Sequence, residues 1–309
     1  MLNVNHILFP TDFSEGARQA FPQAVFLADQ HDATLHILNV EETEPTAPEA
    51  ESTSLPAPTD TLANWLGGAE EAPDEPSAPD LDQLSLVQKQ VQSDAPPERI
   101  VAYAEDVDID LVVMGTHGRR GLRRMLVGSV TEEVVRKAPC PVLTVRTRAA
   151  SAPKTSIRRI LVPVDFSEAS NAAIRHAKEI ALTYGAEIDL LHVVREIAYP
   201  SAYGFEPATF SMDEVLDRAE EELGDLARKE VGIEHATVEA TVGDPATGIL
   251  DYVEVNESDL VVLATHGRTG IDRFLIGSVA ERVLRRSPTP VFIVPPGRKS
   301  LVPADEAPA

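Results

Sequence analysis

The sequence predicts an α/β protein built from two tandem doubly wound domains. Three observations support this: the chain repeats itself, apolar runs alternate with helical patterns within each repeat, and 309 residues exceed the usual size of one compact domain. The apolar runs are continuous rather than alternating, which is typical of parallel strands buried on both faces. Helices between such strands imply right-handed crossovers.

The repeat is visible in three matched stretches. HILFPTDFSEGA near the start returns as RILVPVDFSEAS, and DLVVMGTHGRRGLRRMLVGSV returns as DLVVLATHGRTGIDRFLIGSV. The closing runs CPVLTVR and TPVFIVP match as well. The offset is 153 residues at the first stretch and 149 at the second, so the first copy is longer by four residues in its middle.

The elements are clearest in the second copy. Strands are predicted at residues 160–164, 188–194, 236–242, 260–264 and 291–294. Helices are predicted at residues 167–184, 212–231, 247–256 and 278–286. The domain boundaries follow as residues 1–146 and 157–296, with a polar linker at 147–156 and a flexible tail at 297–309.

The middle segments of the two copies differ in composition and in predicted structure. Where the second copy has the helix 212–231, the first has residues 41–80, with eleven acids, seven prolines and no Lys or Arg. This composition predicts a disordered acidic segment, which is either a partner-binding arm or a solvated loop. An apolar sheet face of the first copy is then expected to lack its cover, unless Leu62, Trp65 and Leu66 form a turn that docks on it.

Charge and cysteine content exclude several classes of protein. The formal net charge of −23 argues against nucleic acid and acidic membrane surfaces as partners. The single cysteine, Cys140, excludes an internal disulfide and a cysteine zinc cluster, and we expect a buried structural thiol. The N-terminus does not read as a signal peptide, and no apolar run reaches the length of a membrane span. We therefore expect a soluble, cytoplasmic protein.

The strongest chemical signal follows the fourth strand of each copy. In the first copy, Gly115 is followed after two residues by Gly118, and after nine more by Gly128 and Ser129. Glycines let the backbone approach a phosphate closely, and Ser129 begins a helix whose unpaired N–H groups favour anions. The spacing matches neither the P-loop nor the Rossmann glycine triplet. Its repetition 149 residues later makes the signal specific.

On these residues, both halves resemble universal stress protein domains of the subgroup with the signature Gly, two residues, Gly, nine residues, then Gly and Ser or Thr. The resemblance covers nearly the whole chain apart from residues 41–80 and the tail. It implies five-stranded parallel sheets of strand order 3-2-1-4-5 and dimer-like pairing of the two halves through their last strands. It also implies binding of ATP or a related adenine nucleotide, with or without Mg²⁺.

The resemblance also implies a site in each copy. Asp12 and Asp165 would contact the nucleoside, and the backbone of Val40 and Val193 would face the adenine. The other implied nucleotide contacts are Pro10, Thr11, Met114, Gly115, His117, Gly118, Arg119, Gly128, Ser129 and Val130 in the first copy, and Pro163, Val164, Ala264, His266, Gly267, Arg268, Gly277, Ser278 and Val279 in the second. A helix-capping role is the alternative for both aspartates, since Ser14 and Ser167 follow them near helix starts.

Each copy departs from the signature at one position. Ala264 replaces the first glycine in the second copy, which weakens that site if the position needs a positive φ and matters little if it needs only close approach. In the first copy, Asp94 stands where the second has Gly243, and an inward carboxylate would repel phosphate.

Arginines are also unevenly distributed between the two copies. Four of them, Arg119, Arg120, Arg123 and Arg124, crowd the first loop, either as phosphate contacts or as a solvated helix face.

These observations favour a nucleotide-binding stress-response regulator that acts on an unknown protein client as an internal pseudo-dimer. A weak ATP hydrolase or phosphotransferase is the alternative, and a scaffold with degenerate sites is the third hypothesis. No catalytic residue is predicted, because Ser129 and Ser278 lack a nucleophile elbow and an assignable base. No metal site is predicted either, because His117 and His266 lack neighbouring ligands. A further homodimer is left open.

Overall fold

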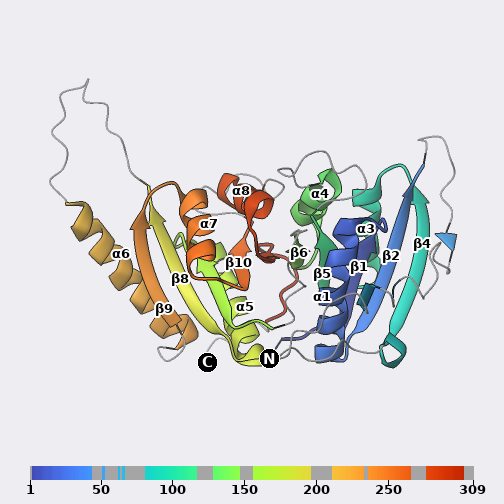
Figure 1. The fold of residues 1–309 in the computed structure, drawn as a ribbon, viewed down its shortest axis with the longest axis horizontal. Helices are drawn as coiled ribbons and strands as arrows, with labels where there is room; N and C mark the ends of the chain where they lie inside the picture. The colour runs from blue at the N-terminus through green and yellow to red at the C-terminus, as the bar shows by residue number, and fades with distance from the viewer. Residues whose placement is uncertain are drawn as a thin grey trace, which may run out of the picture.

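The computed structural model describes residues 2–43, 51–52, 62, 65–66, 81–116, 128–146, 156–195, 211–232, 236–265 and 276–302. Within these residues, one eleven-stranded sheet runs through both halves of the molecule in the order β3-β4-β2-β1-β5-β6-β11-β10-β7-β8-β9 (Figure 1). Neighbouring strands pair in parallel except β3 with β4 and β6 with β11.

The first domain has the predicted strand order. Its strands are β1 (His6–Thr11), β2 (Thr34–Glu42), β3 (Glu51–Ser52), β4 (Leu86–Ser93), β5 (Leu111–Gly115) and β6 (Val142–Val145). Its helices are α1 (Glu15–His31), the short η1 (Leu81–Gln83), α3 (Pro96–Asp106) and α4 (Ser129–Lys137). Apart from β3, which adds an antiparallel edge to β4, the order along the sheet is 3-2-1-4-5.

The second domain repeats this topology without the extra edge strand. Its strands are β7 (Arg159–Pro163), β8 (Glu187–Val194), β9 (Ala236–Val242), β10 (Leu260–Ala264) and β11 (Val291–Val294). Its helices are α5 (Glu168–Tyr184), α6 (Met212–Leu226), the π-helical η3 (Ala227–Val231), α7 (Pro245–Val255) and α8 (Ser278–Arg286). The predicted fold class is confirmed, and the predicted element bounds differ from these by no more than two residues at any end.

The core has two layers, one on each face of the sheet. Along β1, Ile7 and Phe9 pack in the layer under α1 and α5, whereas Leu8 between them packs in the layer under α3, α4, α7 and α8. This alternation follows from the two-residue period of a strand. Both layers contain residues from both halves, so the domains share one continuous core.

The two domains join through their last strands. β6 runs antiparallel to β11, with Leu143 opposite Phe292, and the Thr144 hydroxyl donates to the Val291 carbonyl at 3.2 Å. Above this junction α4 and α8 lie side by side, and the Arg285 guanidinium pairs with the Glu132 carboxylate at 3.0 Å (Figure 1). The pairing leaves β6 and β11 without an open edge.

The stretch after β11 corrects the sequence prediction. Residues 297–302 were expected to be a flexible tail, but they cross onto the first domain as a strap. The Lys299 backbone N–H donates to the Pro139 carbonyl at 3.0 Å, and Lys299 Nζ lies 2.8 Å from the Asp110 carboxylate. Leu301 is buried, and its N–H donates to His176 Nε2 at 3.2 Å. The strap could not be predicted from local sequence pattern, because the groups that hold it are a backbone carbonyl and side chains far away in the sequence.

The structure corrects the start of the disordered segment that the sequence predicts in the first domain. β2 continues through Glu42, so the first two residues of the predicted disordered segment 41–80 are strand. The predicted docking turn is confirmed, because Leu62 and Leu66 are buried in the core and Trp65 contacts Phe21 at a ring-centroid distance of 5.6 Å. Most of residues 44–80 lies outside the described residues, and disorder there stays a prediction.

Two smaller expectations concern the thiol and the membrane. Cys140 is buried as predicted, and burial raises the pKa of its thiol to about 12. Among the described residues, no helix combines the length and apolar character needed to cross a bilayer.

Candidate functional site

The candidate site lies where the first strand of each domain separates from its neighbour. In the described part of the chain, β1 pairs with β5 through Ile7 and Leu8 alone, and β7 pairs with β10 through the two matching residues. Pro10 and Pro163 lie two residues further along β1 and β7. Proline has no N–H, and none is needed where the strand has separated from its neighbour. In an order 3-2-1-4-5 the winding direction reverses here, and such crevices bind ligands.

A tight turn directly after β1 holds Asp12. The Asp12 carboxylate accepts the Ser14 N–H at 3.0 Å, and the Ser14 hydroxyl accepts the Ala17 N–H at 3.3 Å as the N-cap of α1. The helix cap is therefore Ser14, whereas Asp12 braces the turn that precedes the helix. Capping is thus assigned to Ser14, and contact of Asp12 with a ligand stays a prediction.

The second domain builds the same turn. The Asp165 carboxylate accepts the Ser167 N–H at 3.2 Å and the Ser167 hydroxyl at 2.6 Å, while Ser167 caps α5. Phe13 and Phe166 in the two turns have φ of 59° and 60°, a left-handed conformation that costs an L-residue about 1–2 kcal/mol. Strain retained in both copies at the same strand end is typical of functional loops.

A side chain from the second strand fixes the end of the first. Asn39 Nδ2 donates to the Thr11 carbonyl at 2.8 Å in the first domain. In the second domain, His192 Nδ1 lies 2.7 Å from the Val164 carbonyl. These contacts bring the ends of β2 and β8, with Val40 and Val193, to the same edge as the aspartates.

Sequence reasoning missed Asn39 and His192. The available signal was a polar residue inside an apolar run at equivalent positions of both copies.

The loop after the fourth strand is closed by the same hydrogen bond in each domain. The Gly128 N–H donates to the Thr116 carbonyl at 2.7 Å, and the Gly277 N–H donates to the Thr265 carbonyl at 2.7 Å. Each glycine is the N-cap of the following helix and brings no side chain to its first turn. The first N–H groups of α4, beginning at Ser129, are therefore left for an anion.

The loops themselves are not described. His117, Gly118, Arg119, His266, Gly267 and Arg268 lie outside the described residues, as do the other three arginines of the first loop. Their implied contacts with phosphate remain predictions. The described flanks place both loops between the carboxyl end of the fourth strand and the start of the next helix.

Gly115 is needed for packing against the protein itself. A Cβ at this position would lie 2.4 Å from the Gly16 carbonyl oxygen and 3.1 Å from the Ala17 nitrogen of α1. The φ of Gly115 is not positive. Of the two explanations for Ala264 in the second copy, the structure therefore supports close approach, and the approach is to the first turn of a helix.

Several implied contacts are core residues. Met114 is buried between the sheet and α3–α4, Val164 is buried under α5, and Pro10 is buried in β1. Val130 and Val279 are half-buried in the first turns of α4 and α8. The side chains of Met114 and Val164 are thus buried in the core, which leaves only their backbone groups for the predicted contact with a ligand.

The turn after the third strand differs between the copies. In the second domain, Gly243 has φ of +157° and Asp244 caps α7 by accepting the Thr247 N–H at 3.1 Å. In the first domain, Asp94 is exposed and Ala95 occupies the N-cap of α3 without a side-chain hydrogen bond. The departure at Asp94 therefore accompanies loss of a helix cap.

Comparison with known proteins agrees with the repeat. The sequence model of the universal stress protein family matches residues 3–146 and 156–295. A universal stress protein of Methanocaldococcus jannaschii is 33% identical over 148 residues, which are 46% of this chain and 84% of that protein. One from Mycobacterium tuberculosis is 31% identical over 207 residues, covering 66% of this chain and 68% of that protein.

A solved structure shares the whole architecture. A crystal structure of a putative universal stress protein from Pseudomonas aeruginosa has a TM-score of 0.65 and 20% identity, and covers 94% of this chain and 93% of that one. At this identity the likeness supports the fold alone. The chain also covers 62% of the length of a further mycobacterial relative, so functions of longer relatives do not transfer directly.

Proposed function

Because the chain belongs to the universal stress protein family, with one matched domain in each half, we propose that it is a stress-response regulator that binds an adenine nucleotide. ATP is the nucleotide expected, held at the crevice between β1 and β5 and at its counterpart between β7 and β10. The two domains act together as an internal pseudo-dimer joined through β6 and β11. Binding, rather than turnover, biases the docking of a protein client.

The chemistry at the described edge supports this assignment. The Asp12 carboxylate can accept hydrogen bonds from the hydroxyl groups of a ribose, and backbone groups at Val40 suit the edge of a planar base. The first turn of α4 offers N–H groups to phosphate oxygens. The described residues contain no group of three or more His, Cys, Asp or Glu spaced to hold a metal, and Mg²⁺ is expected to arrive with the phosphates.

One observation carries the proposal. Both domains close the loop after the fourth strand with the same 2.7 Å hydrogen bond, from a glycine N-cap to a threonine carbonyl. Each domain also has a helix N-terminus without a side-chain cap after this loop and a strained Asp-Phe-Ser turn after its first strand. Two copies that differ at many surface positions keep this arrangement, which suits a phosphate-bearing ligand.

The test is direct identification of bound nucleotide. Freshly purified protein is denatured, and released nucleotide is identified by chromatography and mass spectrometry, with Gly118→Asp and Gly267→Asp variants as a matched pair. We expect an adenine nucleotide in the native protein and its loss from the altered domain only. A carboxylate introduced into the loop should repel a phosphate group.

Other outcomes select the other hypotheses. Steady ATP hydrolysis that disappears in Gly118→Asp would indicate a weak hydrolase. Native protein that carries no nucleotide and fails to bind added ATP in equilibrium dialysis would contradict the proposal and leave a scaffold of paired domains.

A further inference from the structure

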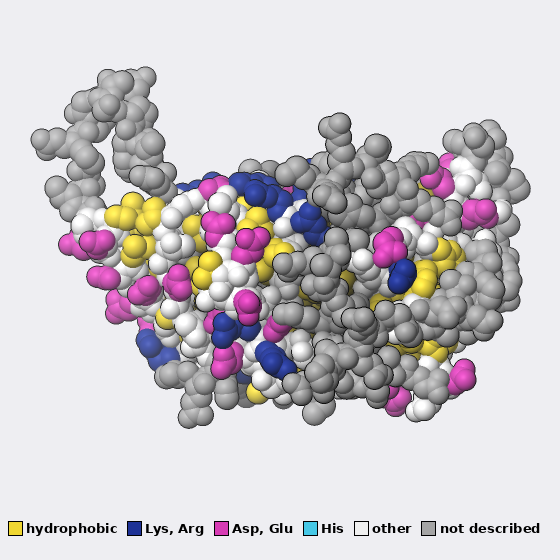
Figure 2. Space-filling view, viewed as in Figure 1, with side chains coloured by type: hydrophobic (Ala, Val, Ile, Leu, Met, Phe, Trp, Pro, Cys, Tyr) yellow, Lys and Arg dark blue, Asp and Glu magenta, His cyan; other side chains and the backbone are white. Residues whose placement is uncertain are grey.

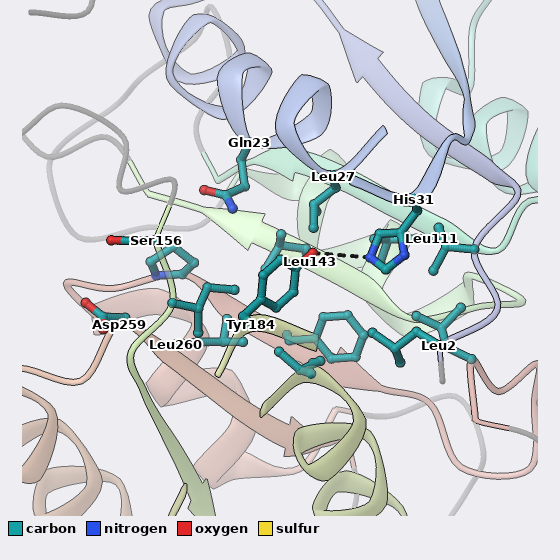
Figure 3. Close-up of a pocket in the computed structure, with 16 residues that line it drawn as sticks. Leu2, Gln23, Leu27, His31, Leu111, Leu143, Ser156, Tyr184, Asp259 and Leu260 are labelled. Carbon is teal, nitrogen blue, oxygen red and sulfur yellow. Dashed lines mark hydrogen bonds between the residues drawn. The ribbon is translucent and has the colours of Figure 1, made fainter. Parts of the chain in front are cut away.

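The cavity at the junction of the two domains is too small for an organic ligand. It leaves about 40 Å³ for the centre of a water-sized sphere, and by the same measure one water needs about 10–15 Å³. Its walls come from both halves, and two side chains at the wall, His31 and Tyr184, share a hydrogen bond of 3.2 Å (Figure 3). The space suits a few water molecules and gives no basis for a ligand site.

The two outer ends of the sheet are finished differently. In the first domain, β3 adds an antiparallel strand to β4, with Ser52 opposite Gln90. In the second domain, β9 is the last strand of the sheet among the described residues. β4 and β9 are equivalent, because each pairs in parallel with the second strand of its domain. The fold therefore accepts an added strand at this edge, and within the described part of the chain the second copy has none.

A backbone N–H of β9 points to this outer edge. The Gly243 N–H donates to the Val194 carbonyl of β8 at 2.9 Å. Because the hydrogen-bonding direction alternates along a strand, Ala240, three residues earlier, directs its N–H away from β8. The Glu220 carboxylate of α6 accepts that N–H at 3.4 Å. In the register of the two sheets, Ala240 is the counterpart of Gln90, which lies opposite β3 in the first domain.

The contact from Glu220 is a weak cover for this edge. Its length of 3.4 Å exceeds the usual N–H···O distance of about 2.9–3.0 Å, and the Glu220 side chain is exposed. A carbonyl oxygen of an added strand can therefore replace the carboxylate at small cost, and the displaced carboxylate is then free to pair with a basic side chain.

The charge at the edge is reversed between the two domains. Leu38 of β2 pairs with Lys89, whereas the equivalent Leu191 of β8 pairs with Glu239. The strand added beside Lys89 comes from residues 41–80, which hold eleven acids and no Lys or Arg. In the second domain, Glu239 is exposed on one face of β9, and α6 on the other face carries seven acidic residues and one arginine (Figure 2). An edge with carboxylates on both faces suits a basic strand, since opposite charges stabilise neighbouring strands.

We propose that the β9 edge binds an extended, basic peptide segment of a partner protein by antiparallel strand addition. The peptide backbone takes the Ala240 N–H from Glu220. Successive Lys or Arg side chains of the peptide point to opposite faces, toward Glu239 on one and toward the carboxylates of α6 on the other. A second copy of this chain is a poor occupant, because the net charge of −23 opposes self-association. The site does not depend on nucleotide binding.

Three peptides of about nine residues, the length of a strand, test the proposal. The first alternates Thr and Val around two adjacent central lysines, and the second has glutamates in place of the lysines. The third keeps the lysines but carries N-methyl groups on its central backbone nitrogens, so it cannot pair as a strand. Each is titrated into ¹⁵N-labelled full-length protein, and the amide shifts of Val238, Ala240 and Val242 are followed.

We expect saturable shifts at these three amides with the lysine peptide. The glutamate peptide should bind about tenfold more weakly, and the methylated peptide should give no saturable shifts at the edge. Absence of binding by the lysine peptide would overturn the proposal. Equal binding of the lysine and methylated peptides would also overturn it, in favour of attraction by charge without strand pairing.

Two substitutions with the same change in charge test the position of the site. Glu239→Lys copies the charge of Lys89, which the equivalent strand tolerates, and should reverse the preference so that the glutamate peptide binds more tightly. Glu221→Lys is the matched control, because this exposed residue lies on the opposite side of α6 from the buried Ala219 and Leu223, and it should keep the preference for lysine.

Two further results would count against the proposal. Equal effects of Glu239→Lys and Glu221→Lys would overturn the placement at the edge of β9. Shifts of the Ala240 amide that depend on protein concentration in the absence of peptide would assign the edge to a second copy of the chain and overturn the basic partner.

Discussion

The two domains share a backbone but differ in the polar cluster under their sheets. In the first domain, His6 Nδ1 lies 3.2 Å from His36 Nε2, and His36 Nδ1 lies 2.9 Å from the Tyr103 hydroxyl. At the equivalent positions the second domain has Arg159, Asp189 and Tyr252, with Arg159 Nε 3.8 Å from the Asp189 carboxylate. Tyr252 donates to that carboxylate.

The difference teaches that apolar runs determine the topology, whereas buried polar clusters are exchangeable if every group finds a partner. A histidine pair and an ion pair both satisfy the tyrosine hydroxyl, because an imidazole and a carboxylate each offer an acceptor. The two solutions respond differently to acid, because burial and the neighbouring His6 both disfavour protonation of His36. The first cluster is therefore acid-sensitive, whereas the second is built on an ion pair.

The outer strands show a second difference of the same kind. In β9 the face under α6 carries Val238 and Ala240, and α6 presents acidic residues to solvent on its other side (Figure 2). In β4 the corresponding face carries Gln88, Gln90 and Gln92 after Leu86. The expectation of an apolar face is therefore wrong at this strand, because glutamines stand where the second domain has apolar residues.

The largest expected effect concerns the packing of β5 on α1. Gly115→Ala places a methyl group against the backbone of Gly16, which cannot move without shifting the start of α1, and we expect a loss of about 3 kcal/mol in the stability of the first domain. The reverse change, Ala264→Gly, should cost only about 0.5–1 kcal/mol from backbone entropy. Hydrogen exchange resolved by domain measures both. Equal costs in the two variants would show that the copies pack alike.

Acid should weaken the first domain through His36. Burial and the neighbouring His6 lower the pKa of His36 from 6.5 to about 4, and the side chain is 5% exposed. The unfolded chain then binds a proton that the folded chain refuses, so stability is full above pH 6.5 and falls as the pH drops to about 4. The loss is about 3 kcal/mol, at about 1.4 kcal/mol per pKa unit.

A double substitution isolates this contribution. His6→Arg with His36→Asp transplants the cluster of the second domain, and the fall in stability between pH 6.5 and 4 should shrink by the share of His36. Burial raises the pKa of Asp189, so that group loses no stability on acidification. His31 and His176 also have lowered pKa values through burial and retain their acid effect in both proteins. Identical urea-unfolding profiles against pH for the two proteins would refute the role of the histidine pair.

Leu62, Trp65 and Leu66 pack against the core of the first domain, and the loss of stability on removing one of them should be intermediate. Trp65 contacts Phe13 and Phe21 at ring-centroid distances of 6.0 and 5.6 Å. Trp65→Ala should lower the stability of the first domain by about 2 kcal/mol through lost ring packing, and Trp65→Phe by less. Hydrogen exchange at α1 provides the measurement. Unchanged protection in Trp65→Ala would mean that the turn rests on the core without stabilising it.

Much of this architecture was predictable because it depends on local pattern. Continuous apolar runs such as 260–264 and 291–294 match β10 and β11, and the repeated Gly-Ser pairs mark the starts of α4 and α8. The strap at 297–302 and the partner of Gly115 were not predictable, because both depend on which backbone lies nearby in space. The roles of Asp12 and Ser14 were ambiguous for a related reason. Both residue types cap helices, and only the geometry of the turn distinguishes them.

The smallest effect should come from the helix start after the third strand. Asp244 caps α7, but Ala95 at the N-cap of α3 brings no acceptor to the Glu98 N–H. Ala95→Ser supplies that hydroxyl without adding a charge beside Asp94, and should stabilise the first domain by about 0.5–1 kcal/mol. Hydrogen exchange at the first turn of α3 is the measurement, with Ala95→Val as the control that adds bulk but no acceptor. Equal protection in the serine and valine variants would show that the turn geometry, with the Ser93 hydroxyl accepting the Ala95 N–H at 3.2 Å, has already replaced the cap.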